Sequence, residues 1–409
     1  MIRNDRRFLA LQDKPLIGFG LFVLVICLAN IILNNVNHRF WLTDFNVYYA
    51  AAKNLTNGSA VYLQAFGDGS GYYKYSPVIL CFFMPYLALN YYVASVIHFT
   101  ILSAAFFYAF VLIYRMLTRY FFQEPVKRAG QLLSIAFTGM VIHLVRELYL
   151  GNINILLLCL CLVALRHYLK GKTVSGSILF GIVLLTKPFY LLLILPLLFR
   201  KRIKAIAVIA LTILVGLLLP FALFGIDRTL SLYSGWMKIM EVHTAVFPGK
   251  NTLEYLVGYY FIPDLPWYTD MIIIFVVAVI FSVFNWFNLK LEKSRTLPGK
   301  SGDQDFIFEW WILLALIPNL VKTDSEHFLS TAPLLAFLVF FIALRKKYWL
   351  IPVMVILIFF YGANSKDLLG STLSERLFSM GLFGLSNLIL VILSFVSFLD
   401  FRTKQASSL

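Results

Sequence analysis

Long apolar runs, separated by short basic segments, constrain the fold of this chain more than any other feature. A helix that crosses a bilayer needs about 20 mostly apolar residues. Of the 409 residues, 60% are hydrophobic and only 13% are charged, whereas soluble domains carry about 25% charged residues. The chain is therefore predicted to be an all-α polytopic membrane protein, and an ordinary soluble domain is excluded. Apolar runs occur at 16–35, 92–114, 131–149, 153–168, 205–224, 269–289, 307–321, 328–344, 348–361 and 380–399.

Two further apolar stretches do not fit single spans. Residues 76–90 are too short, and residues 176–199 are interrupted by Lys187-Pro188. Because Lys and Arg accumulate in cytoplasmic loops, we expect 76–90 to be embedded at the outer side and 176–199 to be a hairpin of two short helices. This topology gives about 12 transmembrane helices with both termini in the cytoplasm. The alternative, in which each stretch is one span, leaves two basic clusters outside.

The basic residues are distributed as loop anchors. The formal charge is +15 and comes from 35 Lys and Arg against 20 Asp and Glu, but these cations are scattered between apolar runs and form no long basic stripe. Nucleic acid is therefore not expected as a partner. The expected partner of these cations is the lipid bilayer. We predict one integral domain over 1–409, with a module at 1–204 and a more variable helical half at 205–409.

The predicted topology gathers the long loops and most unusual polar residues at the outer face, where ionisable groups near the membrane tend to mark function. Asp44 follows the first span, and the apolar residues after it recur at helical spacing. Asp44 is thus either a helix-start residue stabilised by the dipole or a base at the lipid interface. His327 is the second candidate, in a charged turn before a later span. Further candidates for substrate binding are Lys187, Arg146, Glu147, Asn152, Asn154, Lys74, Tyr75, Lys250, Asn251 and Lys322.

Several candidates have a structural alternative. Lys187 either reaches a phosphate or directs its ammonium to water at a helix break, and one of Asn152 and Asn154 is expected to cap the helix that starts at Ile155. His98 lies inside a span without evident partners, so it is not among the candidate site residues.

The order of short motifs resembles glycosyltransferase family 87. These motifs are Asp44 with Val47-Tyr48-Tyr49-Ala50-Ala51, Tyr62, Tyr75-Ser76-Pro77, Gly151-Asn152-Ile153-Asn154, Gly181 with Thr186-Lys187-Pro188, and His327 with Pro333. Members are polytopic enzymes of the GT-C fold, typified by mannosyltransferases that use polyprenyl-phosphate mannose. The resemblance implies a GT-C-type helical bundle whose first outer loop, 36–90, carries the catalytic Asp and two juxtamembrane helices, at 46–57 and 76–90.

The resemblance also implies a reaction. A hexose, with mannose as the first choice, would move from a polyprenyl-phosphate donor to a lipid or glycan acceptor at the outer face of a bacterial cytoplasmic membrane. Such transfer needs a base for the acceptor hydroxyl, for which Asp44 is the candidate. It also needs donors that stabilise the leaving phosphate, for which His327 and nearby cations are candidates. The turn at Glu147 lacks an acidic pair, so no metal is expected at the site, and no cofactor is expected either. The expected stereochemical outcome is inversion.

Two other function classes remain open from the residues alone. A secondary transporter or lipid flippase would also have broken helices and ionisable residues at depth, but no internal repeat is found. A polyprenyl-diphosphate-glycan ligase or polymerase is expected to have an arginine-rich outer loop, and the loop at 225–268 contains only Arg228.

Overall fold

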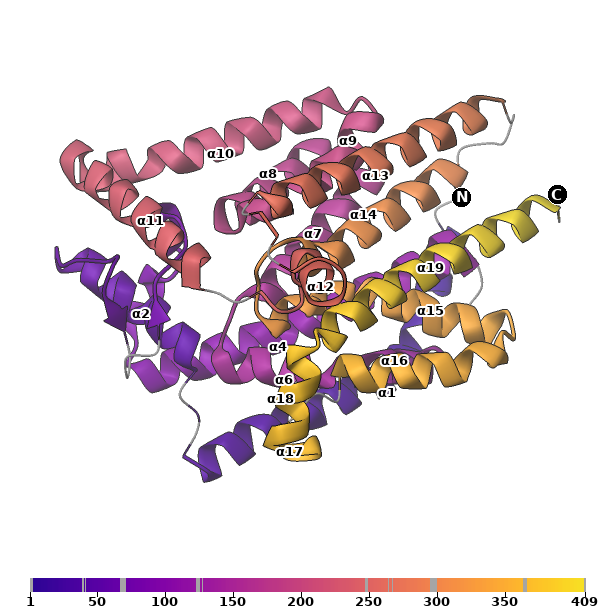
Figure 1. Cartoon of the computed structure of the whole chain (residues 1–409), viewed down its shortest axis with the longest axis horizontal. Helices are drawn as coiled ribbons and strands as arrows, with labels where there is room; N and C mark the ends of the chain where they lie inside the picture. Colours follow the sequence, from indigo (N-terminus) through magenta and orange to yellow (C-terminus); the bar gives the residue numbers. More distant parts are fainter. Residues whose placement is uncertain are drawn as a thin grey trace. The chain divides into compact units, whose positions relative to one another are not determined.

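A computed structural model describes residues 3–38, 40, 42–66, 71–122, 126, 128–246, 249–263, 265–266, 268–294, 300–362 and 366–407. Helices make up nearly all of the regular structure in this described part (Figure 1). The exception is a short antiparallel pair, β1 (Ala65–Phe66) with β2 (Gly71–Tyr72), in which Ala65 lies opposite Tyr72. The expected all-α architecture is confirmed.

The chain begins with a long helix and continues through short helices in the first outer loop. Pro77 starts α3 and fits there because the first turn of a helix does not need its N–H. The elements up to residue 199 are α1 (Arg3–Val36), α2 (Thr43–Thr56), α3 (Pro77–Leu80), η1 (Met84–Ala88), α4 (Tyr91–Met116), η2 (Leu117–Phe122), α5 (Ala129–Thr138), α6 (Val141–Leu150), α7 (Asn154–Leu169), α8 (Thr173–Thr186), η3 (Pro188–Ile194) and α9 (Leu195–Phe199).

The remaining elements include longer apolar helices. They are α10 (Ile203–Phe224), α11 (Ile226–Val246), α12 (Leu253–Tyr260), α13 (Thr269–Ser294), α14 (Lys300–Leu320), η4 (Ser325–Thr331), α15 (Ala332–Leu344), η5 (Tyr348–Leu350), α16 (Ile351–Gly362), α17 (Lys366–Leu369), α18 (Ser371–Ser379) and α19 (Leu382–Ser407).

Five helical segments of the described chain are long and apolar enough to cross a membrane: Leu16–Val36, Tyr91–Phe122, Ile203–Phe224, Ser325–Leu344 and Leu382–Thr403. A sixth results if α5 and α6, which are bent by 65° at their junction, count as one span. The membrane class is thus supported, whereas the count of about 12 spans is not confirmed, because other apolar runs form shorter helices. Residues 77–88 form α3 and η1 and are among these shorter pieces, as the sequence predicts.

The chain folds into two compact units that are interleaved in sequence. Unit 1 comprises 1–26, 110–144 and 249–409, and unit 2 comprises 27–109 and 145–248. The expected single domain with halves at 1–204 and 205–409 stays a prediction.

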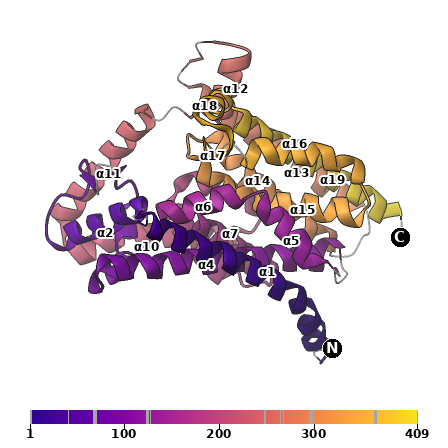
Figure 2. The same ribbon diagram turned by 90° about the horizontal axis from the view of Figure 1, so that it is seen from below.

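Unit 1 is built around the last helix. In it, α19 packs along α14, α15 and α16, and these four helices lie together in both views (Figures 1 and 2). Buried amides connect them: Asn387 donates to Asn319 Oδ1 at 2.6 Å and accepts from the Thr331 hydroxyl at 2.7 Å. Such polar bridges fix the register between helices whose surfaces are otherwise apolar.

Unit 2 contains the first outer loop. There α8 lies between α7 and α10 (Figure 1), while α2 packs against α3, η1 and the β pair. The helix α2 forms one amphipathic face, with Phe45, Tyr48, Ala52 and Leu55 buried at spacings of three or four. The expected break at Lys187 is present, since the residue before Pro188 is extended at φ −138° and ψ 96°, as proline requires.

Candidate active site

Asp44 lies in the first turn of α2 and is half-buried. The start of α2 is held by an unusual backbone. Leu42, the residue before the helix, has φ 43° and ψ 65° although it is not a glycine. Backbone of this kind costs energy and persists only where the surroundings hold it, often at functional sites. The expectation that Asp44 stands at a helix start is confirmed.

Asn152 connects Asp44 to two tyrosines. Its Nδ2 donates to Asp44 Oδ2 at 2.7 Å. Its Oδ1 accepts from the hydroxyls of Tyr48 and Tyr75, each at 3.3 Å, and from the backbone N–H of Ile153 at 2.7 Å. An amide whose oxygen is fixed in this way can present its NH2 group in one orientation only. The turn before α7 therefore orients the carboxylate of α2.

The backbone before Asn152 is fixed by a histidine. His98 Nε2 lies 2.9 Å from the carbonyl oxygen of Gly151, and Nδ1 lies 3.3 Å from the hydroxyl of Tyr86. Its ring stacks on Phe45, the neighbour of Asp44, with centroids 4.2 Å apart. The prediction that His98 lacks partners is wrong, because residues distant in sequence supply all three contacts.

A second group of polar residues surrounds Asn154. Its Nδ2 donates to Glu147 Oε2 at 3.0 Å, and its Oδ1 accepts from Lys187 Nζ at 2.6 Å. Glu147, Asn154 and Lys187 are all buried. The ammonium of Lys187 also lies 5.6 Å from the centroid of the Tyr75 ring, so this group adjoins the tyrosines that bond Asn152.

The expectation that Asn152 or Asn154 caps α7 is wrong, because a different side chain bonds the start of this helix. The backbone N–H of Ile155 donates to Glu147 Oε1 at 3.0 Å, so a carboxylate from α6 satisfies the helix start. A carboxylate there is also favoured by the helix dipole. The amide of Asn154 is turned toward Glu147 and Lys187 instead.

Tyr48 is a member of the site that sequence reasoning did not select. Its hydroxyl lies 3.1 Å from that of Tyr75 and donates to Asn152. Burial raises the pKa of Tyr48 well above its ordinary value of 10.0, and the nearby Tyr75 and Asp44 raise it further. The hydroxyl therefore stays protonated and keeps donating. Its position four residues after Asp44, on the same helix face, was the available signal.

Two other predicted site residues, Arg146 and Lys74, also belong to unit 2. Arg146 is exposed on α6, whereas its neighbour Glu147 faces inward. Lys74 is half-buried, and its backbone oxygen accepts from Trp236 Nε1 at 2.9 Å.

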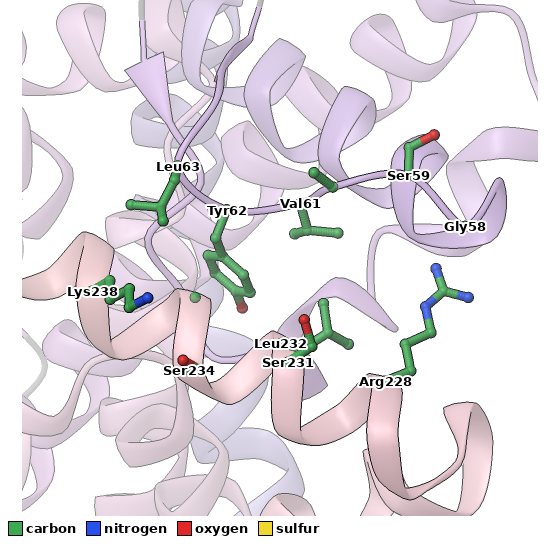
Figure 3. Close-up of a pocket in the computed structure, with 12 residues that line it drawn as sticks. Gly58, Ser59, Val61, Tyr62, Leu63, Arg228, Ser231, Leu232, Ser234 and Lys238 are labelled. Atoms are coloured by element: carbon green, nitrogen blue, oxygen red, sulfur yellow. The ribbon is translucent and has the colours of Figure 1, made fainter.

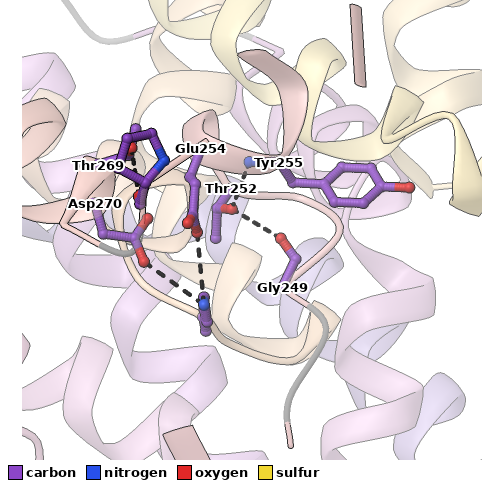
Figure 4. A network of polar contacts seen from close by, with 8 residues as sticks. Gly249, Thr252, Glu254, Tyr255, Thr269 and Asp270 are labelled. Atoms are coloured by element: carbon purple, nitrogen blue, oxygen red, sulfur yellow. Dashed lines mark hydrogen bonds and ion pairs between the residues drawn. The ribbon is translucent and has the colours of Figure 1, made fainter. Parts of the chain in front are cut away.

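The remaining predicted site residues belong to unit 1. His327 is buried in the short helix η4, where Nδ1 lies 3.2 Å from the backbone oxygen of Asp324. Lys322 Nζ lies 3.6 Å from Glu254 and 3.8 Å from Asp270. Figure 4 labels both carboxylates and draws these contacts as dashed lines. Lys250 Nζ lies 5.3 Å from the Phe378 ring centroid, and buried Asn251 accepts from Asn319 through its backbone oxygen at 2.8 Å.

Asp44 and His327 thus belong to different units, and their action on one substrate stays a prediction. The residues that unit 2 does bring together are Asp44, Tyr48, Tyr75, Glu147, Asn152, Asn154 and Lys187, which we call the Asp44 cluster. Across the described residues, no three His, Cys, Asp or Glu side chains gather as metal ligands would.

Comparison with known proteins gives a match to a protein-family model. A search of curated proteins finds no significant relative. The model of glycosyltransferase family 87 matches residues 73–297, more than half of the chain and all of the Asp44 cluster except Asp44 and Tyr48. The match and the apolar helices together support a membrane glycosyltransferase. The chain belongs to glycosyltransferase family 87.

Proposed function

We propose that this protein transfers a hexose, most readily mannose, from a polyprenyl-phosphate sugar to a lipid or glycan acceptor at the outer face of a bacterial cytoplasmic membrane. Asp44 is the general base, within a GT-C-type fold. The observation that carries the proposal is the bond of 2.7 Å from Asn152 to Asp44, which orients the carboxylate of a half-buried aspartate at the start of an amphipathic helix.

The chemistry follows from this carboxylate. Asp44 accepts the proton of the acceptor hydroxyl, and the acceptor oxygen forms a bond to the anomeric carbon as the bond from that carbon to the phosphate oxygen breaks. The electron pair of the broken bond leaves with the polyprenyl phosphate. Attack opposite to the leaving group inverts the anomeric configuration. No metal is needed in this scheme.

Cations stabilise the negative charge that develops on the leaving phosphate. In unit 2, Lys187 is the candidate, because its buried ammonium is held by Asn154 next to Tyr75. His327, Lys322 and Lys250 of unit 1 are proposed as further donors to the phosphate or the acceptor.

A transfer assay tests the proposal. Purified protein is incubated with a short-chain polyprenyl phosphate that carries radiolabelled mannose, and with membrane lipid extract as the acceptor pool. Asp44→Asn removes the base while keeping side-chain size, and we expect the rate to fall by about 10²- to 10⁴-fold. Asp227→Asn is the matched control, because Asp227 is also in the first turn of a helix in unit 2 but is exposed and outside the cluster.

The assay also has clear adverse outcomes. Turnover of Asp44→Asn at the rate of the unaltered protein would remove Asp44 as the base. No transfer from mannose or any other polyprenyl-phosphate sugar would reject this donor class and favour a diphosphate-linked donor.

A further inference from the structure

A pocket of about 480 Å³ lies between residues 58–63 and helix α11 (Figure 3). Its volume is within the range of about 300–1,000 Å³ that is typical of small-ligand sites. All lining residues belong to unit 2, and none belongs to the Asp44 cluster. The pocket is therefore lined by residues other than those assigned to the transfer reaction above.

The pocket is cationic. Arg228, Ser231, Gly235 and Lys238 line it at intervals of three and four residues, so they share one face of α11. Figure 3 shows Arg228 and Lys238 toward opposite ends, with Tyr62 between them. The lining contains both cations and no carboxylate. Within the described residues, neither cation forms an ion pair, so the positive charge of the pocket is not neutralised there.

The arginine is fixed in position. Arg228 Nη2 donates to the backbone oxygen of Leu55, in the last turn of α2. A guanidinium has five N–H donors in a rigid plane, so others remain for a ligand while one holds Leu55. Its geometry matches phosphate oxygens well. The hydroxyls of Ser59, Ser231 and Ser234, which also line the pocket, add neutral donors.

The opposite face of α11 indicates where the ligand comes from. Ile226, Leu230 and Met237 are exposed there, and their spacing of four and seven residues places them on one stripe. An amphipathic helix with an exposed apolar stripe and a cationic face is typical of the membrane interface. The preceding helix α10 is a candidate membrane span, which brings α11 to the lipid boundary.

We propose that this pocket binds the phosphate group of an anionic lipid headgroup. Arg228 and Lys238 hold the anion from two ends, and the serine hydroxyls bond its oxygens or the glycerol. Because Arg228 also holds the last turn of α2, the helix whose first turn carries Asp44, the bound lipid steadies that helix. The proposal goes beyond the transfer reaction and does not depend on it.

Binding is measured with the purified full-length protein in a neutral detergent. The probes are short-chain phosphatidylglycerol, short-chain phosphatidylcholine and glycerol 3-phosphate. We expect phosphatidylglycerol to bind most tightly and its affinity to fall as salt is raised, because salt screens the exposed charges. Lys238→Gln and Arg228→Gln should each weaken this binding by about tenfold, the usual effect of losing one charge-assisted hydrogen bond.

Two further variants sharpen the test. Ser231→Phe fills the pocket without changing its charge and should also weaken binding. Lys53→Gln removes an exposed lysine of α2 that does not line the pocket, and it should bind as the unaltered protein does. If Arg228→Gln fails to fold because the Leu55 carbonyl loses one of its donors, the exposed Lys238 still tests the site.

The outcomes separate this proposal from the transfer reaction. Asp44→Asn should bind phosphatidylglycerol normally even when it transfers no sugar. The lipid site would be overturned if Lys238→Gln and Ser231→Phe bound phosphatidylglycerol as tightly as the unaltered protein does. It would also be overturned if the unaltered protein bound phosphatidylcholine as tightly as phosphatidylglycerol. Neither result would affect the transfer reaction. Glycerol 3-phosphate binding as tightly as phosphatidylglycerol would reject the lipid as the source and assign the pocket to a soluble phosphate.

Discussion

The ring of His98 donates a hydrogen bond from Nε2 to the carbonyl of Gly151, at 2.9 Å. A carbonyl can only accept, so Nε2 carries the proton, and Nδ1 accepts from the hydroxyl of Tyr86. Gly151 precedes Asn152, which orients Asp44. A histidine of α4 therefore positions the carboxylate without contacting it.

Replacing His98 should lower turnover more than it lowers substrate affinity. We expect His98→Leu to reduce kcat by about tenfold, in line with the loss of one hydrogen bond that leaves a buried carbonyl without its donor, while KM for the donor changes little. His98→Gln, whose amide can donate to the same carbonyl, should recover part of kcat. Steady-state kinetics of the folded fraction provide the measurement.

His143 offers a matched control for that prediction. Its Nε2 lies 2.9 Å from the carbonyl of Tyr361, and its ring stacks on Phe383, but both partners belong to unit 1. His143→Leu should lower stability to a similar degree without a specific loss of kcat. Equal losses of kcat in the two variants would reduce His98 to a purely structural residue.

Asn152→Asp should move the pH dependence of transfer. The substitution brings a second carboxylate close to Asp44 and removes the donated hydrogen bond, and both changes disfavour the charged form of Asp44 and raise its pKa. A base with a raised pKa stays protonated to higher pH, so the acid limb of the kcat/KM profile shifts upward. Asn54→Asp is the control, since it lies about 15 Å away along α2; a shift of equal size there would contradict the local explanation.

Gly151→Ala and Gly171→Ala should differ in both stability and activity. Both glycines have positive φ, 66° and 70°, so each substitution costs about 1–2 kcal/mol of backbone strain. A Cβ on Gly151 would also lie 2.9 Å from that of Phe45, whereas Gly171 has open space around it. Thermal unfolding and transfer rates should show a larger loss of both for Gly151→Ala, and equal losses would exclude a steric role for the contact with Phe45.

The first outer loop should lose stability at alkaline pH. Burial raises the pKa of Tyr48, Tyr62 and Tyr73 well above 10.0. When pH exceeds about 10, tyrosines of the unfolded chain release their protons before those of the folded protein. The folded state then binds more protons, and the free energy of unfolding falls as pH rises. Melting temperatures should be flat from about pH 6 to 9 and decline above, and a triple replacement by Phe should flatten the decline.

The sequence determined the elements that depend on local chemistry and on the solvent. Apolar runs identified the membrane class, the apolar spacing after Asp44 identified α2, and Lys187-Pro188 identified the break after α8. The motif order also identified the family, which the match to residues 73–297 confirms. The first three features each lie within one short segment of the chain, because helix geometry and transfer into lipid act on such segments.

Only the tertiary structure decided how these residues work together. The bonds from Asn152 to Asp44 and from His98 to Gly151 join residues that lie 108 and 53 positions apart, and no local pattern predicts such pairs. Glu147 lies only eight positions before Ile155, but the packing of α6 beside α7 decides that its carboxylate caps α7 in place of the asparagines. An inward-facing polar group must find a partner where water is excluded, and packing of distant helices determines which partner is within reach.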